Sequence, residues 1–197
     1  MITSMGALRD ALGRAPAMSF STLGGSIFRP DNAGPLRRTK NFAEAEVIFR
    51  GCAALLFVPL GRWDVVRVEA TARRLQQMTL RSLCRYDLYR DELRWCDSLG
   101  RGRTSDIILQ PLPGGVPLPQ ALPRLPHDEL RRMVDSLREE MTGIGFTHNN
   151  LRPDNIIAGR DGRLHPIRYH YATLGSSCRD DFGPLYELCG GCGSGGV

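Results

Sequence analysis

Lysine is almost absent from this sequence. Lys40 is the only one, so the formal net charge of +5 is carried by arginine. The arginines are scattered through predicted helical segments without interleaved aromatic residues, which favours solvated helix faces over a nucleic-acid surface. No apolar run approaches the length of a membrane span, and the N-terminus lacks the apolar core of a signal peptide. We therefore expect a cytoplasmic protein that binds neither membranes nor nucleic acid.

Cysteine is present, but it does not form the pattern of a disulfide framework or a metal site. The chain has 197 residues and 42% apolar content, enough to bury a core without disulfides. Cys189 and Cys192 form one CxxC motif, but no second pair and no nearby histidine completes four ligands. We therefore expect buried free thiols in a reducing compartment, no metal and no cofactor. The six cysteines are Cys52, Cys84, Cys96, Cys178, Cys189 and Cys192.

The pattern of apolar, charged and turn-forming residues divides the chain into four segments. Residues 1–40 are predicted to form an N-terminal surface helix and an irregular segment, and residues 41–112 a part containing strands and helices. A connector rich in Pro and Gly leads into residues 113–188, and residues 189–197 form a flexible glycine-rich tail.

Two kinds of periodicity occur within residues 41–112. The apolar runs AEVIF and AALLFVPL flank Arg50-Gly51, which predicts an antiparallel hairpin. Helical spacing of apolar residues predicts one helix from Val65 to Leu75 and a longer one from Leu83 to Cys96. On the longer helix Glu92 is expected to be a solvated charge. Its aromatic residues are expected to serve packing: Tyr86, Tyr89 and Trp95.

Residues 113–188 combine a helix with a polar loop. Helical spacing predicts a helix from His127 to Met141, followed by the loop HNNLRPDNII, His148 to Ile157. Asp161-Gly162 in GRDGRLHPI predicts a hairpin turn. The aromatic residues Tyr169 to Tyr171 in IRYHY are then expected to alternate on a strand.

The stretch GFTHNNLRPDNIIAGRDGRLHPI resembles the catalytic loop and metal-binding hairpin of the protein-kinase-like superfamily. The matching residues are His148, Leu151, Pro153, Asn155 and the turn at Asp161-Gly162. Upstream, DIILQPLPGG resembles the last strand of the small lobe and the hinge. Downstream, DDFGPLYEL resembles the helix that supports the loop, which makes Asp180 and Asp181 loop-supporting residues.

This resemblance implies an α+β, protein-kinase-like two-lobed fold. The strand-containing N-lobe would lie in residues 41–112, and a reduced helical C-lobe would lie in residues 113–188. It also implies lost chemistry, because Asn150 stands where the family has its catalytic base, and an amide cannot accept the proton. Arg168 stands where the family has a metal-binding aspartate, and a guanidinium repels a metal ion.

The remaining parts of phosphoryl transfer are also incomplete. Asn155 keeps the second metal-ligand position, but AALLFVPL contains no lysine to hold phosphates and no GxGxxG loop occurs. The resemblance therefore implies a pseudokinase without a catalytic residue or a metal, in which nucleotide binding is weak or absent. Its degenerate active-site positions are His148, Asn150, Arg152, Asn155 and Arg168.

Two roles for Arg168 follow from its charge. With Arg152 it could form an anion site. Alternatively, it could form a structural ion pair with Asp154, Asp180 or Asp181. The ion pair is favoured, since buried arginines usually find a carboxylate. His148 would pack inward and bond the backbone, and Asn150 would satisfy backbone groups in a tight loop.

Three functions are compatible with these patterns. The first is a catalytically inactive kinase-like domain that acts as a protein-interaction or regulatory module, because the frame of the loop is kept without its chemistry. The second is an atypical phosphotransferase or nucleotide-binding enzyme of the small-molecule-kinase type, with Asn155 and Arg168 in new roles. The third is a basic nucleic-acid-binding protein of unrelated fold. We predict the first, with a protein as the partner.

Overall fold

The computed structural model of the chain describes residues 4–61, 63, 65–175 and 181–190. These residues form two compact units. Unit 1 comprises Met1–Ala72 and Arg85–Leu112, and unit 2 comprises Arg73–Cys84 and Pro113–Val197.

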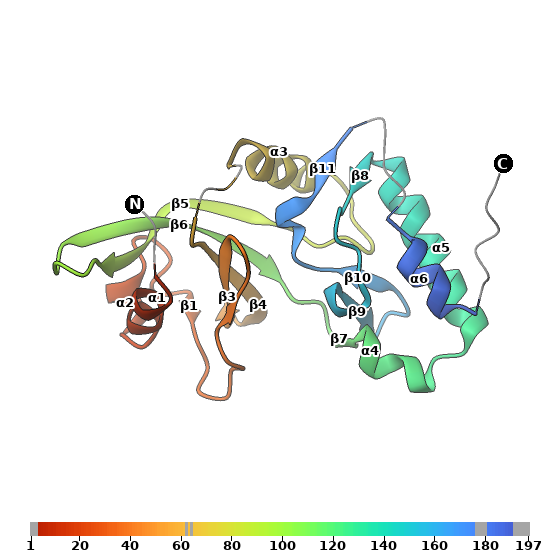
Figure 1. Cartoon of the computed structure of the whole chain (residues 1–197), viewed down its shortest axis with the longest axis horizontal. Helices are drawn as coiled ribbons and strands as arrows, with labels where there is room; N and C mark the ends of the chain where they lie inside the picture. The colour runs from red at the N-terminus through yellow and green to blue at the C-terminus, as the bar shows by residue number, and fades with distance from the viewer. Residues whose placement is uncertain (1–3, 62, 64, 176–180, 191–197) are drawn as a thin grey trace. The chain divides into compact units, whose positions relative to one another are not determined.

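Unit 1 is built on a curled antiparallel sheet that forms a half-barrel (Figure 1). Its strands pair in the order β1-β3-β4-β6-β5, and β2 also pairs with β3. The strands are β1 Ile27–Phe28, β2 Arg37–Arg38, β3 Phe42–Phe49, β4 Cys52–Pro59, β5 Asp87–Cys96 and β6 Gly102–Pro111.

The predicted hairpin around Arg50-Gly51 is confirmed. Strands β3 and β4 pair from Phe42↔Pro59 to Phe49↔Cys52, which leaves two residues in the turn. Arg50 has φ 50° and Gly51 has φ 80°. Positive φ at both positions is typical of the type I′ turn, whose twist matches that of paired strands.

A hydrophobic core covers one face of this sheet. Helix α1 Met5–Leu12 is capped by Ser4, whose hydroxyl accepts the N–H of Ala7 at 3.1 Å, and it is followed by the short α2 Pro16–Ser19. Leu8 and Ala11 of α1 are buried against strand residues, so the expected surface helix is in fact part of the core. The strand residues of this core include Ala45, Val47, Leu56, Val58, Leu93, Trp95 and Ile107.

The predicted helix from Leu83 to Cys96 is wrong, because residues Asp87–Cys96 form strand β5. The register with β6 shifts between Tyr89 and Leu93, where Asp91 adopts φ 50°. This β-bulge interrupts the alternation of inward and outward side chains. Apolar residues before and after the bulge are therefore separated by three or four positions, which imitates the period of a helix.

The shorter predicted helix is confirmed as α3 Val65–Gln76, with Val68, Ala72 and Leu75 buried.

Unit 2 contains short strands and the longest described helix (Figure 1). Helix α5 His127–Gly143 buries Leu130, Met133, Val134, Leu137 and Met141, which confirms the predicted helix. The hairpin β9 Ile156–Gly159 and β10 Leu164–Pro166 confirms the turn at Asp161-Gly162. The other elements are β7 Gly115–Pro117, α4 Leu118–Ala121, η1 Leu122–Arg124, β8 Phe146–Thr147, η2 Pro153–Asn155, η3 Tyr169–Tyr171, β11 Thr173–Leu174 and α6 Gly183–Leu188.

The predicted strand at Tyr169–Tyr171 is wrong. These residues form the 3₁₀ turn η3, entered through Arg168 in the left-handed region at φ 69°. A 3₁₀ turn does not alternate its side chains as a strand does. Tyr169 and His170 are consequently both buried.

The protein-kinase-like resemblance and its two-lobed fold are wrong. The structure is an α+β protein in which antiparallel strands predominate, and its described helices are few and small. In the described part of the chain only α5, with 17 residues, is longer than the 12 residues of α3, so no helical C-lobe is formed. The motif matched because a short polar loop followed by a tight hairpin is a local arrangement that does not specify the surrounding fold.

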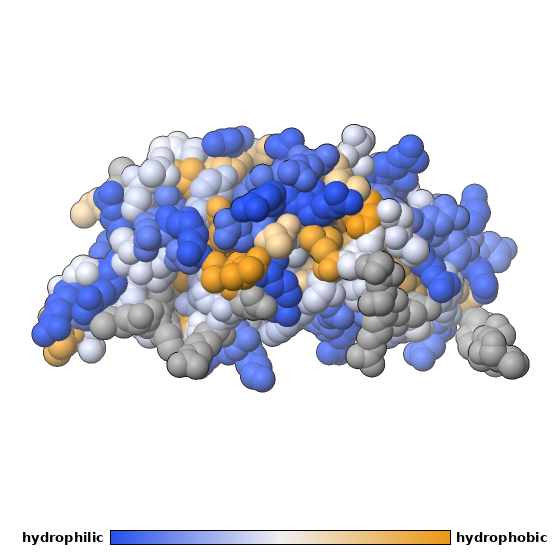
Figure 2. Space-filling view, turned by 90° about the horizontal axis from the view of Figure 1, so that it is seen from above, coloured by the Kyte–Doolittle hydropathy of each residue, from blue (hydrophilic) through white to orange (hydrophobic). Residues whose placement is uncertain are grey.

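Polar residues predominate on the face seen in Figure 2, with small hydrophobic groups between them. Among the described residues, none of the helices combines the length and the apolar character that crossing a bilayer requires.

Candidate functional site

The loop that follows β8 brings several of the predicted site residues together in unit 2. His148 is fully buried, and its Nε2 donates to the carbonyl oxygen of Ile167 at 2.9 Å. The rings of Phe146 and Tyr169 contact the imidazole edge-on, with centroids 6.5 and 5.7 Å away. Burial lowers the pKa of His148, because the charged imidazolium would lose its hydration there. His148 is therefore a neutral packing residue that holds the loop to the segment after β10.

The two asparagines at the centre of the loop take part in hydrogen bonds between side chains and the backbone. Asn149 has φ 60°, and its amide donates to the carbonyl of Tyr171 at 2.9 Å and to the hydroxyl of Thr173 at 3.0 Å. Its backbone N–H donates to the carboxylate of Asp181. The carbonyl of Asn150 accepts the side-chain amide of Asn155 at 2.9 Å. These contacts fix the path of the chain between β8 and η2.

Arg168, in the segment that follows β10, bonds to the C-terminal part of this loop. Its guanidinium donates to the backbone carbonyl of Asp154 at 3.1 Å and to the side-chain oxygen of Asn155 at 3.3 Å. These two bonds go to a carbonyl and an amide rather than to a carboxylate. The left-handed conformation of an arginine costs about 1–2 kcal/mol, which the surrounding contacts must offset.

The structure thus brings together His148, Asn150, Asn155, Arg168 and Asp181, while the side chain of Arg152 is exposed. Asp180 lies outside the described residues, as do Cys178, Cys192 and most of the predicted tail. In residues 4–61, 63, 65–175 and 181–190, no group of three or more His, Cys, Asp or Glu side chains is placed to hold a metal ion. The side chains of Asn149, Asn155 and Arg168 are engaged in holding the shape of this loop.

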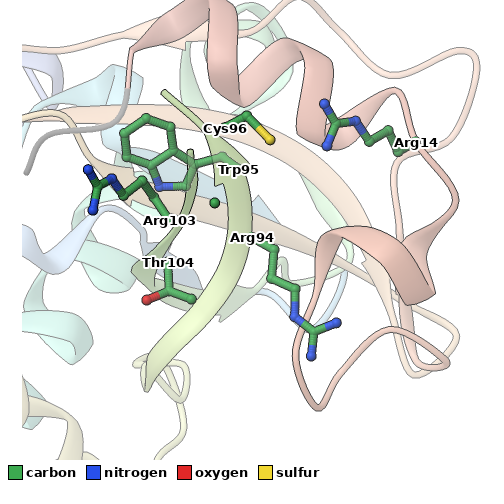
Figure 3. Close-up of a pocket in the computed structure, with 7 residues that line it drawn as sticks. Arg14, Arg94, Trp95, Cys96, Arg103 and Thr104 are labelled. Carbon is green, nitrogen blue, oxygen red and sulfur yellow. The ribbon is translucent and has the colours of Figure 1, made fainter. Parts of the chain in front are cut away.

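A second site, which the sequence did not indicate, is a cavity of about 610 Å³ in unit 1. It lies along β5 and β6 near their turn and also touches the segment after α1. Figure 3 shows Arg14 extending toward Cys96, and Arg94 leaving the same strand in another direction. The lining residues are Arg14, Arg94, Trp95, Cys96, Gly102, Arg103 and Thr104.

The three arginines of this cavity differ in their partners. Arg103 donates through Nε and Nη2 to one carboxylate oxygen of Asp97, at 3.1 and 3.0 Å. Arg94 donates through Nε to the hydroxyl of Ser21 at 3.2 Å. In the part of the chain that the structure describes, neither Arg14 nor Arg94 has a carboxylate within ion-pair distance. Among the described residues, no carboxylate therefore neutralises these two guanidinium groups at the open cavity.

The turn between β5 and β6, residues 97–101, is held by Asp97. One oxygen of its carboxylate accepts the backbone N–H groups of Leu99 at 3.0 Å and Arg101 at 2.9 Å, while the other oxygen accepts Arg103. The hydrogen bond from Arg101, together with those from Leu99 and Arg103, lowers the pKa of Asp97. Leu99 at the tip is 70% exposed. We call residues 94–104 the hairpin surface.

The sequence pattern does not predict this cavity, because its apolar spacing predicts a helix over residues 83–96. A usable signal was present in RWCDSLGRGRTSDII, where Asp97 and Gly100 separate Trp95 from the strand-favouring residues that follow: Thr104, Ile107 and Ile108. Pairing Trp95 with Arg103 across this turn would have placed Arg94, Cys96 and Thr104 at the same end of the sheet.

The thiols also differ from the prediction. Cys52, Cys84, Cys96 and Cys189 are free, but Cys52 and Cys96 are exposed rather than buried.

Neither the protein-family models nor the curated proteins include a match to this chain. The function is therefore argued from the two sites alone.

Proposed function

We propose that the chain is a non-catalytic protein-binding module that uses the hairpin surface of unit 1. The absence of catalysis is supported by the loop of unit 2, where Asn149 bonds to the carbonyl of Tyr171, and Asn155 and Arg168 bond to residues of the loop. Groups that serve a reaction must be free to contact a substrate. The side chains that bond within the loop are not free in this way.

The observation that carries the binding role is the ordered hairpin turn with its exposed tip. Asp97 accepts two backbone N–H groups of the turn and is also bonded to Arg103, so the turn is stabilised before any partner arrives. Such preorganisation reduces the conformational entropy lost on binding. Leu99 supplies an apolar contact at the tip, and the cavity with Arg14 and Arg94 lies beside it.

Site-specific photocrosslinking tests this proposal. A benzoylphenylalanine replaces Leu99 in the full chain, and the protein is irradiated in a lysate of the cells that produce it. The control places the same residue at Val66, which is 73% exposed on α3. We expect a discrete adduct with one protein at position 99 and not at position 66. Identical adducts at both positions, or no adduct at 99, would refute the proposal.

We also propose that the module acts in the reducing cytoplasm. Support comes from the four described cysteines, which are free thiols, two of them exposed. Mass spectrometry of protein that is alkylated in denaturant immediately on cell lysis tests this, and we expect each of the four to carry the label. A disulfide at any of them would count against a reducing location.

A further inference from the structure

The cavity beside the hairpin tip has the charge of an anion-binding site. Arg14 and Arg94 are exposed, and within the described chain no carboxylate neutralises either of them. The bond from the Nε of Arg94 to Ser21 leaves both terminal nitrogens of its guanidinium without a hydrogen-bond partner among the described residues. A guanidinium presents its donors in a planar fork that matches the two oxygens of a carboxylate. Anchoring by Ser21 also reduces the side-chain entropy that Arg94 loses on binding.

The same hairpin contains an example of the expected contact. Arg103 binds the carboxylate of Asp97 through two nitrogens, both at about 3 Å from one oxygen. Arg94 pairs with Thr104 and lies on the opposite face of the hairpin from Arg103, where the carboxylate of a partner can reach its guanidinium.

The surroundings of the cavity favour an acidic protein segment over a nucleic acid. Proteins that bind single-stranded nucleic acid stack bases on exposed aromatic rings. Trp95 is the aromatic residue that lines this cavity, but it is only 5% exposed and its indole N–H donates to the hydroxyl of Ser105 at 2.8 Å. The ring is therefore part of the core and does not offer a face for stacking.

On these grounds, and resting on the proposed function, we propose that the cavity binds a segment of the partner protein rich in aspartate or glutamate. Arg14 and Arg94 bind its carboxylates, and Leu99 contacts an apolar side chain of the same segment. Because both arginines are exposed, the interaction weakens as the salt concentration rises.

Fluorescence anisotropy with a fluorescein-labelled hexaglutamate peptide tests the proposal on the full chain. The test variant is Arg14→Gln with Arg94→Gln. The control variant, Arg37→Gln with Arg38→Gln, removes the same charge from β2 of the same unit. Two exposed ion pairs, each contributing about 0.2–1 kcal/mol, correspond to a loss of affinity of about two- to thirtyfold in the test variant. We expect less than a twofold loss in the control.

A third variant, Arg14→Lys with Arg94→Lys, keeps the charge but removes the planar fork. We expect it to bind hexaglutamate with intermediate affinity. Circular dichroism establishes that each variant remains folded.

Several results would overturn the proposal. Equal losses in the test and control variants would show that only net charge matters. Tighter binding of oligo(dT) of equal charge, lost through the same two substitutions, would assign the cavity to nucleic acid. Absence of hexaglutamate binding together with a persistent adduct at position 99 would refute the acidic segment and leave the proposed function standing. Absence of both would refute both.

Discussion

Replacement of Glu92 by glutamine should destabilise unit 1 substantially. The carboxylate of Glu92 lies on the bulged strand β5 and is only 2% exposed. It accepts the backbone N–H groups of Thr22 and Leu23 and the hydroxyl of Thr22, each at 2.7 Å. These contacts join residues about 70 positions apart in the sequence and hold the segment before β1 against the sheet.

The magnitude follows from these contacts. Hydrogen bonds to a charged group contribute about 1.5–3 kcal/mol each, and an unsatisfied buried donor costs about 1–3 kcal/mol. Glutamine keeps one oxygen to accept the two N–H groups, and its NH₂ group can donate to the hydroxyl of Thr22, so the loss comes from exchanging charge-assisted hydrogen bonds for weaker neutral ones. We expect Glu92→Gln to lower the free energy of unfolding of unit 1 by about 2–4 kcal/mol, a large part of the stability of an ordinary domain.

Urea unfolding followed by tryptophan fluorescence measures this change, because both tryptophans of the chain, Trp63 and Trp95, belong to unit 1. Hydrogen exchange at the amides of Thr22 and Leu23 should accelerate in the variant. The matched control is Glu46→Gln on β3, where the glutamate is exposed, and its effect should stay within about 0.5 kcal/mol. A loss below that limit for Glu92→Gln, with unchanged exchange at Leu23, would refute the reasoning.

Three further predictions concern single residues. Gly115→Ala should destabilise unit 2 by more than about 2 kcal/mol, because a Cβ on β7 would overlap a backbone carbonyl of β9. The control Gly114→Ala, at a position with open space around it, should change stability little. Equal unfolding midpoints for the two variants would contradict this prediction. Burial and two nearby carboxylates raise the pKa of Cys84 to about 11. Because the thiolate is the reactive form, iodoacetamide at pH 8 should alkylate Cys84 far more slowly than the exposed Cys96. Equal alkylation rates of the two thiols, measured by mass spectrometry, would refute this prediction. The lowered pKa of Asp97 means that its carboxylate stabilises the folded turn at pH values above the ordinary pKa of 3.8, and that this contribution disappears as pH falls through the lower folded value. In urea titrations, the stability difference between the protein and Asp97→Asn should therefore be constant near neutral pH and shrink below pH 4. A difference that is independent of pH down to pH 2 would contradict this.

Local patterns predicted several elements correctly. The β3–β4 turn depends on residues that adopt positive φ, and Arg50-Gly51 supplied that signal. Helix α5 depends on apolar residues three and four apart, and its buried face is the one that this spacing predicted. In both cases the determining residues are neighbours along the chain.

The errors occurred where distant segments decide the structure. Strand β5 was predicted as a helix because the bulge at Asp91 changes the spacing of its buried residues. Glu92 was expected in solvent, and it is buried because amides from the segment before β1 surround it. The kinase-like fold was inferred from a local motif, and the curled antiparallel sheet contradicts it.

The sequence by itself determined the tight turns, helices α3 and α5, and the predominance of arginine in its positive charge. These properties depend on backbone conformation and on contacts within one turn of a helix. Only the tertiary structure decided that Arg14 and Arg94 border one cavity, and that His148 and Asn149 bond to the segment after β10. Those outcomes depend on pairing and burial between segments far apart in the chain, which no local pattern specifies.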